Sequence, residues 1–157
     1  IQQYLNNLRA FGIIRKIEVF GKKRFAYKLA SPLAKIYYYA DEKYNISERN
    51  YTEKELQPII DELMPRIIED TVREYMAEKN GLRESIVEAK DYDIDACLLK
   101  FGKVEIAMEI KWRKNPAKEI TKAEETLGQI NAKRKIFFVP DKKGIKTILE
   151  TMDPDDL

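Results

Sequence analysis

The sequence predicts an α/β protein built around a mixed sheet, and three observations predict it. The chain has 157 residues, enough for one medium domain or two small ones with a sizeable core. Its second half shows hydrophobic periods in the order helix, three strands, helix, strand, helix. One of those strands, at 135–140, is a short apolar run of the kind that forms a buried strand.

The chain begins with a helical pattern and a basic hairpin. Apolar residues recur at helical spacing over 1–11, and Gly12 follows where a left-handed cap is expected. Two strand-like runs within 13–29 are joined by the turn Gly21-Lys22-Lys23. A helix followed by a basic two-stranded ribbon is the second half of a winged helix. We therefore expect a partial winged-helix domain over residues 1–44, with a recognition helix and a wing.

A short helix and then a domain boundary are expected after the hairpin. Ser31 and Pro32 supply a favourable N-cap and first helical residue for a helix that runs through the tyrosines at 37–39. The segment 44–51 is polar and irregular. We place the second domain at 52–157.

A long amphipathic helix opens this second domain. Thr52 and Glu55 have the spacing of a capping box, and an apolar stripe continues from there until Gly81. Pro58 and Pro65 each lack a backbone donor, so they should kink or split the helix.

The other elements of the second domain follow from the period of their apolar residues. Alternation predicts strands, and spacing of three and four residues predicts helices. Gly102 is expected to turn the chain between the second and third strands. The predicted elements are strands over 82–88, 93–100 and 103–111, a helix over 116–132, a strand over 135–140 and a final helix over 144–152.

The composition excludes several kinds of site. A single cysteine, Cys97, rules out a disulfide framework, and the absence of histidine rules out His-based triads and His-rich zinc sites. No apolar run approaches the length of a membrane span, and no signal peptide is recognisable, so a cytoplasmic protein is expected. Many Lys, Glu and Arg residues are typical of thermophiles. The chain opens with Ile1 inside an apolar pattern, so we expect it to be the C-terminal part of a longer protein.

Charge is distributed in three blocks. Residues 1–36 carry eight basic residues and one acidic residue, a balance of +7. Residues 41–110 carry ten basic and eighteen acidic residues, a balance of −8, and residues 111–146 carry eleven and four, a balance of +7. Two basic ends around an acidic middle indicate a polyanionic partner with a metal site between them.

Two short acidic segments carry the expected chemistry, one at Asp93 to Asp95 and one at Glu109 to Lys111. Alternation places Ile94, Ala96 and Leu98 on one face of the first strand, with Asp95 on the other. It also places Glu109 and Lys111 together on one face of the second strand. Of the two aspartates, we take Asp95 rather than Asp93 as the candidate metal ligand.

Two carboxylates and an ammonium on adjacent strands can hold a divalent cation with a water beside it. Asp95 and Glu109 are the expected ligands of Mg²⁺ or Mn²⁺, with the carbonyl of Ile110 as a third. In the hydrolysis of a phosphodiester, Lys111 would orient or deprotonate the attacking water and stabilise the transition state. Glu69, which borders the apolar stripe of the long helix, is the candidate for an accessory acid.

The element order, together with the D…ExK pattern formed by Asp95, Glu109 and Lys111, resembles the restriction-endonuclease-like PD-(D/E)xK superfamily. More narrowly, the runs DYDIDACLL and EIAMEIKWRKNP resemble the C-terminal region of archaeal AAA-type ATPases. In those chains an ATPase is followed by a winged helix and then this nuclease-like domain. The resemblance extends from YLNNLRAFGII to KIFFVPDKKGI, nearly the whole chain.

The resemblance implies a restriction-endonuclease-like αβββαβ core at 52–157 and a metal-dependent endodeoxyribonuclease. Its implied partners are DNA and an N-terminal ATPase domain, and it allows a homo-oligomer. It assigns catalytic roles to Asp95, Glu109 and Lys111, and an accessory role to Glu69. The chain also departs from the pattern, since no proline precedes the first acid, and Lys133 stands where an aromatic partner of Gln129 is expected.

Basic residues of the hairpin are candidate phosphate contacts. Exposed hairpin tips also carry charge for solubility alone, but further basic residues flank this ribbon on both strands. The predicted nucleic-acid contacts are Arg15, Lys16, Lys22, Lys23, Arg24 and Lys28.

Each assignment has a plainer alternative. Asp95, Glu109 and Lys111 could be a solvent-facing row of a half-exposed strand. The site could also have formed and lost catalysis, which would leave an inactive module that binds nucleic acid or mediates oligomerisation. Glu69 could be an ordinary helix acid, and Glu88 on the first strand is a weaker alternative for its role.

Overall fold

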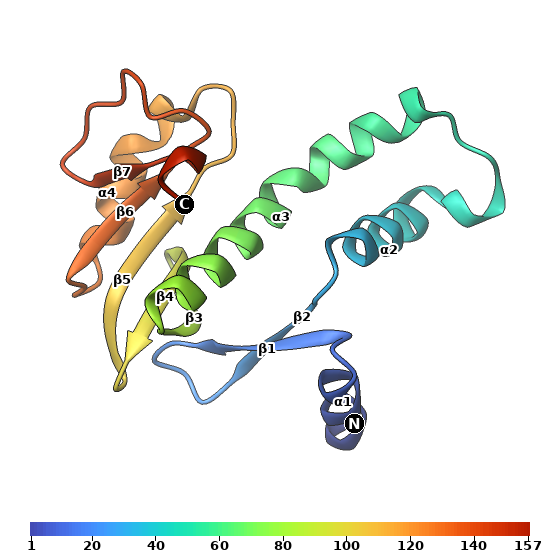
Figure 1. Ribbon diagram of the computed structural model, residues 1–157, viewed down its shortest axis with the longest axis horizontal. Coiled ribbons are helices and arrows are strands. Elements are labelled where there is room, and N and C mark those ends of the chain that lie inside the picture. Colours follow the sequence, from blue (N-terminus) through green and yellow to red (C-terminus); the bar gives the residue numbers. More distant parts are fainter. The chain divides into compact units, whose positions relative to one another are not determined.

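The computed structural model describes residues 1–157, with four α-helices, three short 3-10 helices and seven strands (Figure 1). The helices are α1 (Gln2–Ala10), α2 (Pro32–Tyr44), α3 (Glu53–Asn80) and α4 (Ile120–Gly128), and the 3-10 helices are η1 (Ile46–Glu48), η2 (Pro116–Glu119) and η3 (Pro154–Asp156). The strands are β1 (Ile14–Val19), β2 (Phe25–Leu29), β3 (Arg83–Glu88), β4 (Asp93–Lys100), β5 (Lys103–Ile110), β6 (Arg134–Phe138) and β7 (Glu150–Met152).

All seven strands belong to one sheet, in the order β2-β1-β3-β4-β5-β6-β7. Strand β4 is antiparallel to both β3 and β5, whereas β6 is parallel to both β5 and β7. The predicted α/β class and mixed sheet are therefore confirmed. The parallel pairing of β1 with β3 was not predicted, because the sequence assigned the hairpin to a separate domain.

The chain forms two compact units. The first comprises residues 1–17 and 25–67, and the second comprises 18–24 and 68–157. The tip of the first hairpin belongs to the second unit because the end of β1 pairs with β3 there. Helix α3 runs through both units without a break, so the domain boundary expected at residues 44–51 stays a prediction.

Local signals explain the helices of the first unit. Gly12, with φ of 69°, follows α1 in the left-handed conformation that glycine adopts without strain. The hydroxyl of Ser31 accepts a hydrogen bond of 3.3 Å from the Ala34 amide and caps α2, which extends beyond the predicted tyrosine segment to Tyr44. The ammonium of Lys43 lies 2.5 Å from a Glu62 carboxylate oxygen and links α2 to α3.

Helix α3 begins at the predicted capping box and is continuous over 28 residues. Both the amide and the hydroxyl of Thr52 donate to Glu55, each at 2.8 Å. Of the two outcomes expected at Pro58 and Pro65, a kink or a split, the split is wrong, because both prolines lie inside one helix. Each proline removes only one intrahelical bond. Packing of the apolar stripe on either side keeps the helical path.

The second unit has three layers, with α3 and α4 on opposite faces of the sheet (Figure 1). On one face Val72 and Met76 of α3 pack against Leu98, Ile106 and Met108. On the other, Leu127 of α4 packs in a cluster with Cys97 and Ala107. Each aliphatic side chain buried in this way contributes about 1.5–3 kcal/mol to folding.

A β-bulge interrupts the regular alternation predicted for β4. Ser85 of β3 lies opposite Cys97, but Val87 lies opposite Ile94, so β4 contains one extra residue between these pairs. Ile94 therefore packs in the cluster that contains Cys97 and α4. The prediction that Ile94 shares a face with Ala96 is wrong, because regular alternation stops at the bulge.

The hairpin between β4 and β5 has the predicted turn. Phe101 and Gly102 have φ of 49° and 77°, and two successive positive values characterise the tight turn that suits twisted antiparallel strands.

The last part of the chain differs from the prediction. Helix α4 covers only part of 116–132, since η2 precedes it and residues 129–132 are not helical. The final helix predicted at 144–152 is wrong, because a loop leads there into β7, which pairs with β6. One carboxylate oxygen of Glu124 accepts from the Thr147 hydroxyl at 2.5 Å and from the Ile148 amide at 3.2 Å, which holds this loop out of helical form.

Across all 157 residues, no helix combines the length and the apolar character needed to cross a membrane.

Candidate active site

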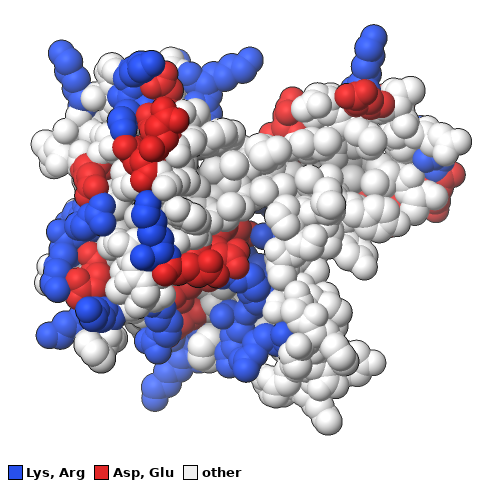
Figure 2. All heavy atoms as spheres, in the orientation of Figure 1, with Lys and Arg blue, Asp and Glu red and all other residues white.

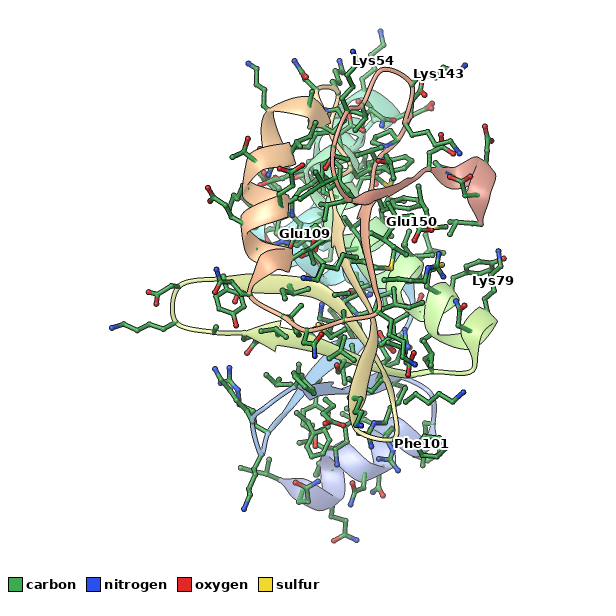
Figure 3. The ribbon with its side chains drawn as sticks, turned by 90° about the vertical axis from the view of Figure 1, so that its left-hand side faces the viewer. Lys54, Lys79, Phe101, Glu109, Lys143 and Glu150 are labelled. Carbon is green, nitrogen blue, oxygen red and sulfur yellow. The ribbon has the colours of Figure 1, made fainter.

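The two acidic segments meet where β4 and β5 run side by side. Asp95 lies on β4, Glu109 lies on β5, and Lys111 directly follows β5. The ammonium nitrogen of Lys111 lies 2.7 Å from Glu109 Oε2 and 3.2 Å from Asp95 Oδ2. Figure 3 shows Glu109 beside β5, on the side of the sheet that α4 covers. The structure thus brings together three of the four predicted catalytic residues.

Asp95 is fixed by the end of the β4–β5 ladder. The last paired residues at this end are Ala96 and Met108, so the Ile110 amide has no backbone partner on β4. Asp95 Oδ2 accepts a hydrogen bond of 2.8 Å from that amide. Because the N–H and C=O of one strand residue point to the same side, the Ile110 carbonyl also faces β4. The carbonyl of Ile110, the third ligand expected from the sequence, thus lies on the side of β5 that faces the strand of Asp95.

Glu109 is the most deeply buried acid of the site, with 5% of its surface exposed. Its Oε2 contacts Lys111, whereas its Oε1 is buried without a hydrogen-bond partner. Burial raises the pKa of Glu109 to about 7; the charge of Asp95 adds to the rise and Lys111 opposes it. A buried polar atom left unsatisfied costs about 1–3 kcal/mol. The folded protein therefore keeps a destabilising, unsatisfied carboxylate oxygen at this position.

Lys111 stays charged in this half-buried site. Burial alone would lower its pKa, but Asp95 and Glu109 outweigh burial and raise the pKa above its ordinary value. Nearby, burial raises the pKa of the Cys97 thiol to about 12, with Glu109 and Asp95 adding to the effect. Cys97 is therefore an inert packing residue and does not serve as a nucleophile.

Glu69 lies on α3 and is half-buried. Its charge is the weakest of the influences that raise the pKa of Glu109, so its carboxylate lies within electrostatic range of the site. No three acids or cysteines of the chain gather closely enough to form a ready metal cluster. The geometry thus places Glu69 near the site but not at a shared ligand distance with Asp95 and Glu109.

The residues fit a magnesium-type cation by the chemistry of their donors. Mg²⁺ takes hard oxygen ligands, commonly one or two carboxylates, and completes its shell with water and substrate phosphate. Asp95 and Glu109 provide two carboxylates, and the unsatisfied Oε1 of Glu109 provides an oxygen that gains a partner only from outside the protein.

The site opens into a pocket of about 390 Å³. Its walls include two residues of α4, Lys122 and Thr126, and the turn before β4 contributes Lys90. Sequence reasoning missed these three residues. Thr126 carried a signal, because it is a buried polar residue between the core residues Ala123 and Leu127 of α4.

A second buried charge cluster was also missed. Arg73 of α3 is only 1% exposed, and it forms an ion pair with Asp70 and another, of 2.7 Å, with Glu84. Its Nη1 donates to the main-chain carbonyl of Asp95 at 2.9 Å, at the bulge of β4. The signal in the sequence was an arginine that directly follows Val72 of the apolar stripe.

The predicted nucleic-acid contacts are partly engaged within the protein. Lys22 donates to the main-chain carbonyl of Glu88, and Arg24 forms an ion pair with the Glu88 side chain. This arrangement makes Glu88 an anchor for the hairpin tip. The Lys16 ammonium lies 3.7 Å from the centre of the Phe25 ring.

The other basic residues of the hairpin are Lys23, which is exposed, and Arg15 and Lys28, which have interactions of their own. Figure 2 shows basic and acidic side chains interleaved over the second unit, with no continuous basic face in that view. Phosphate binding by the hairpin stays a prediction.

Comparisons with protein-family models, with curated proteins and with solved structures found no match for this chain.

Proposed function

We propose that the second unit is a metal-dependent phosphodiesterase of the PD-(D/E)xK type that cuts DNA. One observation above all supports it: Glu109 is buried with an unsatisfied carboxylate oxygen, beside Asp95 and Lys111, in a pocket open to solvent. Active sites are where such perturbed groups concentrate. A row of solvated strand residues would not bury a carboxylate in this way.

Asp95 and Glu109 would hold Mg²⁺ or Mn²⁺, and the carbonyl of Ile110 would be a third ligand. When bound, the cation would neutralise charge on the phosphoryl oxygens and lower the pKa of a coordinated water. The Ile110 amide keeps the Asp95 carboxylate in place. Lys111 would donate to the attacking water or to a non-bridging phosphate oxygen, where charge develops in the transition state.

The pKa of Glu109 sets the working pH range of this arrangement. At a pH well below about 7 the carboxyl is protonated and cannot ligate a cation, whereas above it the carboxylate is available. Activity should therefore rise as the pH increases through neutrality.

The first unit and the hairpin would serve as part of a winged helix that docks DNA phosphates. In this proposal an ATPase domain and further copies of the chain are the partners, as the resemblance to archaeal AAA-type ATPases implies. A cytoplasmic location agrees with such partners.

A second candidate function is an inactive module of the same fold that binds nucleic acid or mediates oligomerisation. Lys111 favours it, because its ammonium already pairs with both Asp95 and Glu109 and so satisfies part of the site without a cation.

Nicking of supercoiled plasmid in Mg²⁺ or Mn²⁺ separates the two candidates. The wild-type chain should convert the plasmid to open circles, and Lys111→Ala should slow the reaction about 10²–10³-fold. Lys103→Ala is the matched control, since Lys103 is an exposed lysine at the opposite end of β5. If supercoiled, linear and branched DNA all stay intact, the enzyme proposal fails and the inactive module stands.

A further inference from the structure

A groove extends from the candidate site along α4. The site pocket adjoins a second pocket of about 330 Å³, and both share the lining residues Asp91, Tyr92, Lys122 and Thr126. Glu125 and Gln129 line only the second pocket. Because the two pockets share four lining residues, a ligand longer than one pocket can occupy both.

The two walls of this groove come from different elements. One wall is α4 with the residue that caps its C-terminal end. Lys122 and Thr126 of the helix and the cap residue Gln129 follow at intervals of four and three residues, so they lie on one side. The opposite wall is the turn between β3 and β4, which contributes Lys90 and Tyr92.

The lysines of the groove differ in how they are paired. Four carboxylates line the site pocket, from Asp91, Asp93, Asp95 and Glu109. Lys111 pairs with two of them, whereas neither Lys90 nor Lys122 forms an ion pair or hydrogen bond in the structure.

Both unpaired lysines are exposed, and they approach from opposite walls. An exposed ammonium that is not held by an internal carboxylate can bind an external anion without breaking an existing ion pair. The groove therefore offers two free cations to a ligand that enters it.

We propose that the groove holds a single strand of nucleic acid, with Lys122 bound to the phosphate next to the one at Asp95 and Glu109. Lys122 lines both pockets, so it stands where the strand leaves the site. Lys90 contacts the strand from the other wall. The outer part of the groove, with the Tyr92 ring and the Gln129 amide, receives a sugar or base. This inference rests on the proposed function, because it assumes that the site takes a phosphodiester.

The test measures binding without cleavage. A fluorescently labelled single-stranded oligonucleotide of about twelve nucleotides is titrated with the full chain in EDTA, and anisotropy is followed at several salt concentrations. Lys122→Ala should weaken binding roughly fivefold and reduce the slope of log K against log salt by about 0.7, the value for one lost single-strand phosphate contact. Lys90→Ala should weaken binding less. Lys103→Ala is the control and should bind like the wild type.

The results separate this inference from the proposed function. The groove proposal would be overturned if Lys122→Ala and Lys103→Ala lost equal affinity for the single strand, or if Lys122→Ala lost none. It would also be overturned if Lys122→Ala lost affinity for duplex DNA alone. If the wild type never nicks plasmid but Lys122→Ala still loses single-strand binding, the groove stands and the enzyme proposal fails. If the wild type nicks plasmid and Lys122→Ala binds and cuts normally, the enzyme proposal stands and the groove fails. Unchanged melting temperatures show that the variants are folded.

Discussion

Two buried charge clusters lie in the second unit, and each contains two acids and one base. In one, Arg73 binds Asp70 and Glu84; in the other, Lys111 binds Asp95 and Glu109. The two clusters meet at one residue, since Arg73 binds the carbonyl of Asp95 and Lys111 binds its carboxylate.

They differ in how completely the base satisfies the acids. The Arg73 guanidinium is a planar fork, and its three nitrogens donate to Glu84, to Asp70 and to the Asp95 carbonyl. Lys111 is a single ammonium, and it leaves Glu109 Oε1 without a partner. We infer that the first cluster is structural, and that the second retains an unfavourable group for function.

The largest expected effect comes from removing the base of the structural cluster. Arg73→Met would remove the guanidinium that pairs with the buried Asp70 and the half-buried Glu84. The free energy of unfolding should therefore fall by about 3–5 kcal/mol in urea titrations. Arg83→Met is the control, because Arg83 is 62% exposed and pairs with Glu18 on the surface. In Arg83→Met the free energy of unfolding should fall by less than about 1 kcal/mol. Equal losses in the two variants would remove the distinction between the clusters.

Replacing Glu109 is expected to raise the free energy of unfolding, the opposite of the effect expected for Arg73→Met. Its folded pKa of about 7 lies above the ordinary 4.5, so the folded state binds this proton more tightly than the unfolded chain does. That contribution to stability is full below about pH 4.5 and is lost as the pH rises through 7. Glu109→Gln should therefore stabilise the metal-free protein at pH 8, by on the order of 1–3 kcal/mol.

Urea unfolding at pH 5 and pH 8 measures this effect. The wild type should lose more stability than Glu109→Gln between the two values. Parallel pH dependences in the two proteins would show that Glu109 titrates normally.

A smaller effect is expected at Glu69. Since its charge is the weakest influence on Glu109, Glu69→Gln should lower the pKa of Glu109 by only a few tenths of a unit. The midpoint of the pH dependence of stability reports this shift. Glu78→Gln, an exposed acid on the same helix, should leave the midpoint unchanged. Equal midpoints in both variants would place Glu69 outside the site.

The sequence predicted those parts of the fold that depend on local signals. The strands β4 and β5 follow from alternation and from Gly102 in their turn, and α3 follows from Thr52 and its partner Glu55. The acids and Lys111 could be predicted because a period of two fixes which strand residues share a face.

The parts that the sequence did not predict depend on distant pairing. The bulge that redirects Ile94 exists because β3 and β4 pair out of regular register, and Arg73 contacts the carbonyl of Asp95 at that point. Strand β7 forms only beside β6, so residues 144–152 looked helical on their own. The position of Lys122 beside the site was not predicted, because the packing of α4 on the sheet decides which face of the helix meets the site.

Calorimetric titration of Mn²⁺ tests the central claim most directly, namely that the unsatisfied oxygen of Glu109 is a metal ligand. The wild type should bind one ion at pH 8 and roughly tenfold more weakly at pH 6, where Glu109 is protonated. Glu109→Gln and Asp95→Asn should abolish binding. Glu105→Gln should bind like the wild type, because Glu105 lies on the same strand but pairs with Lys133. Equal binding by Glu109→Gln and Glu105→Gln, or no binding by the wild type at pH 8, would contradict the account.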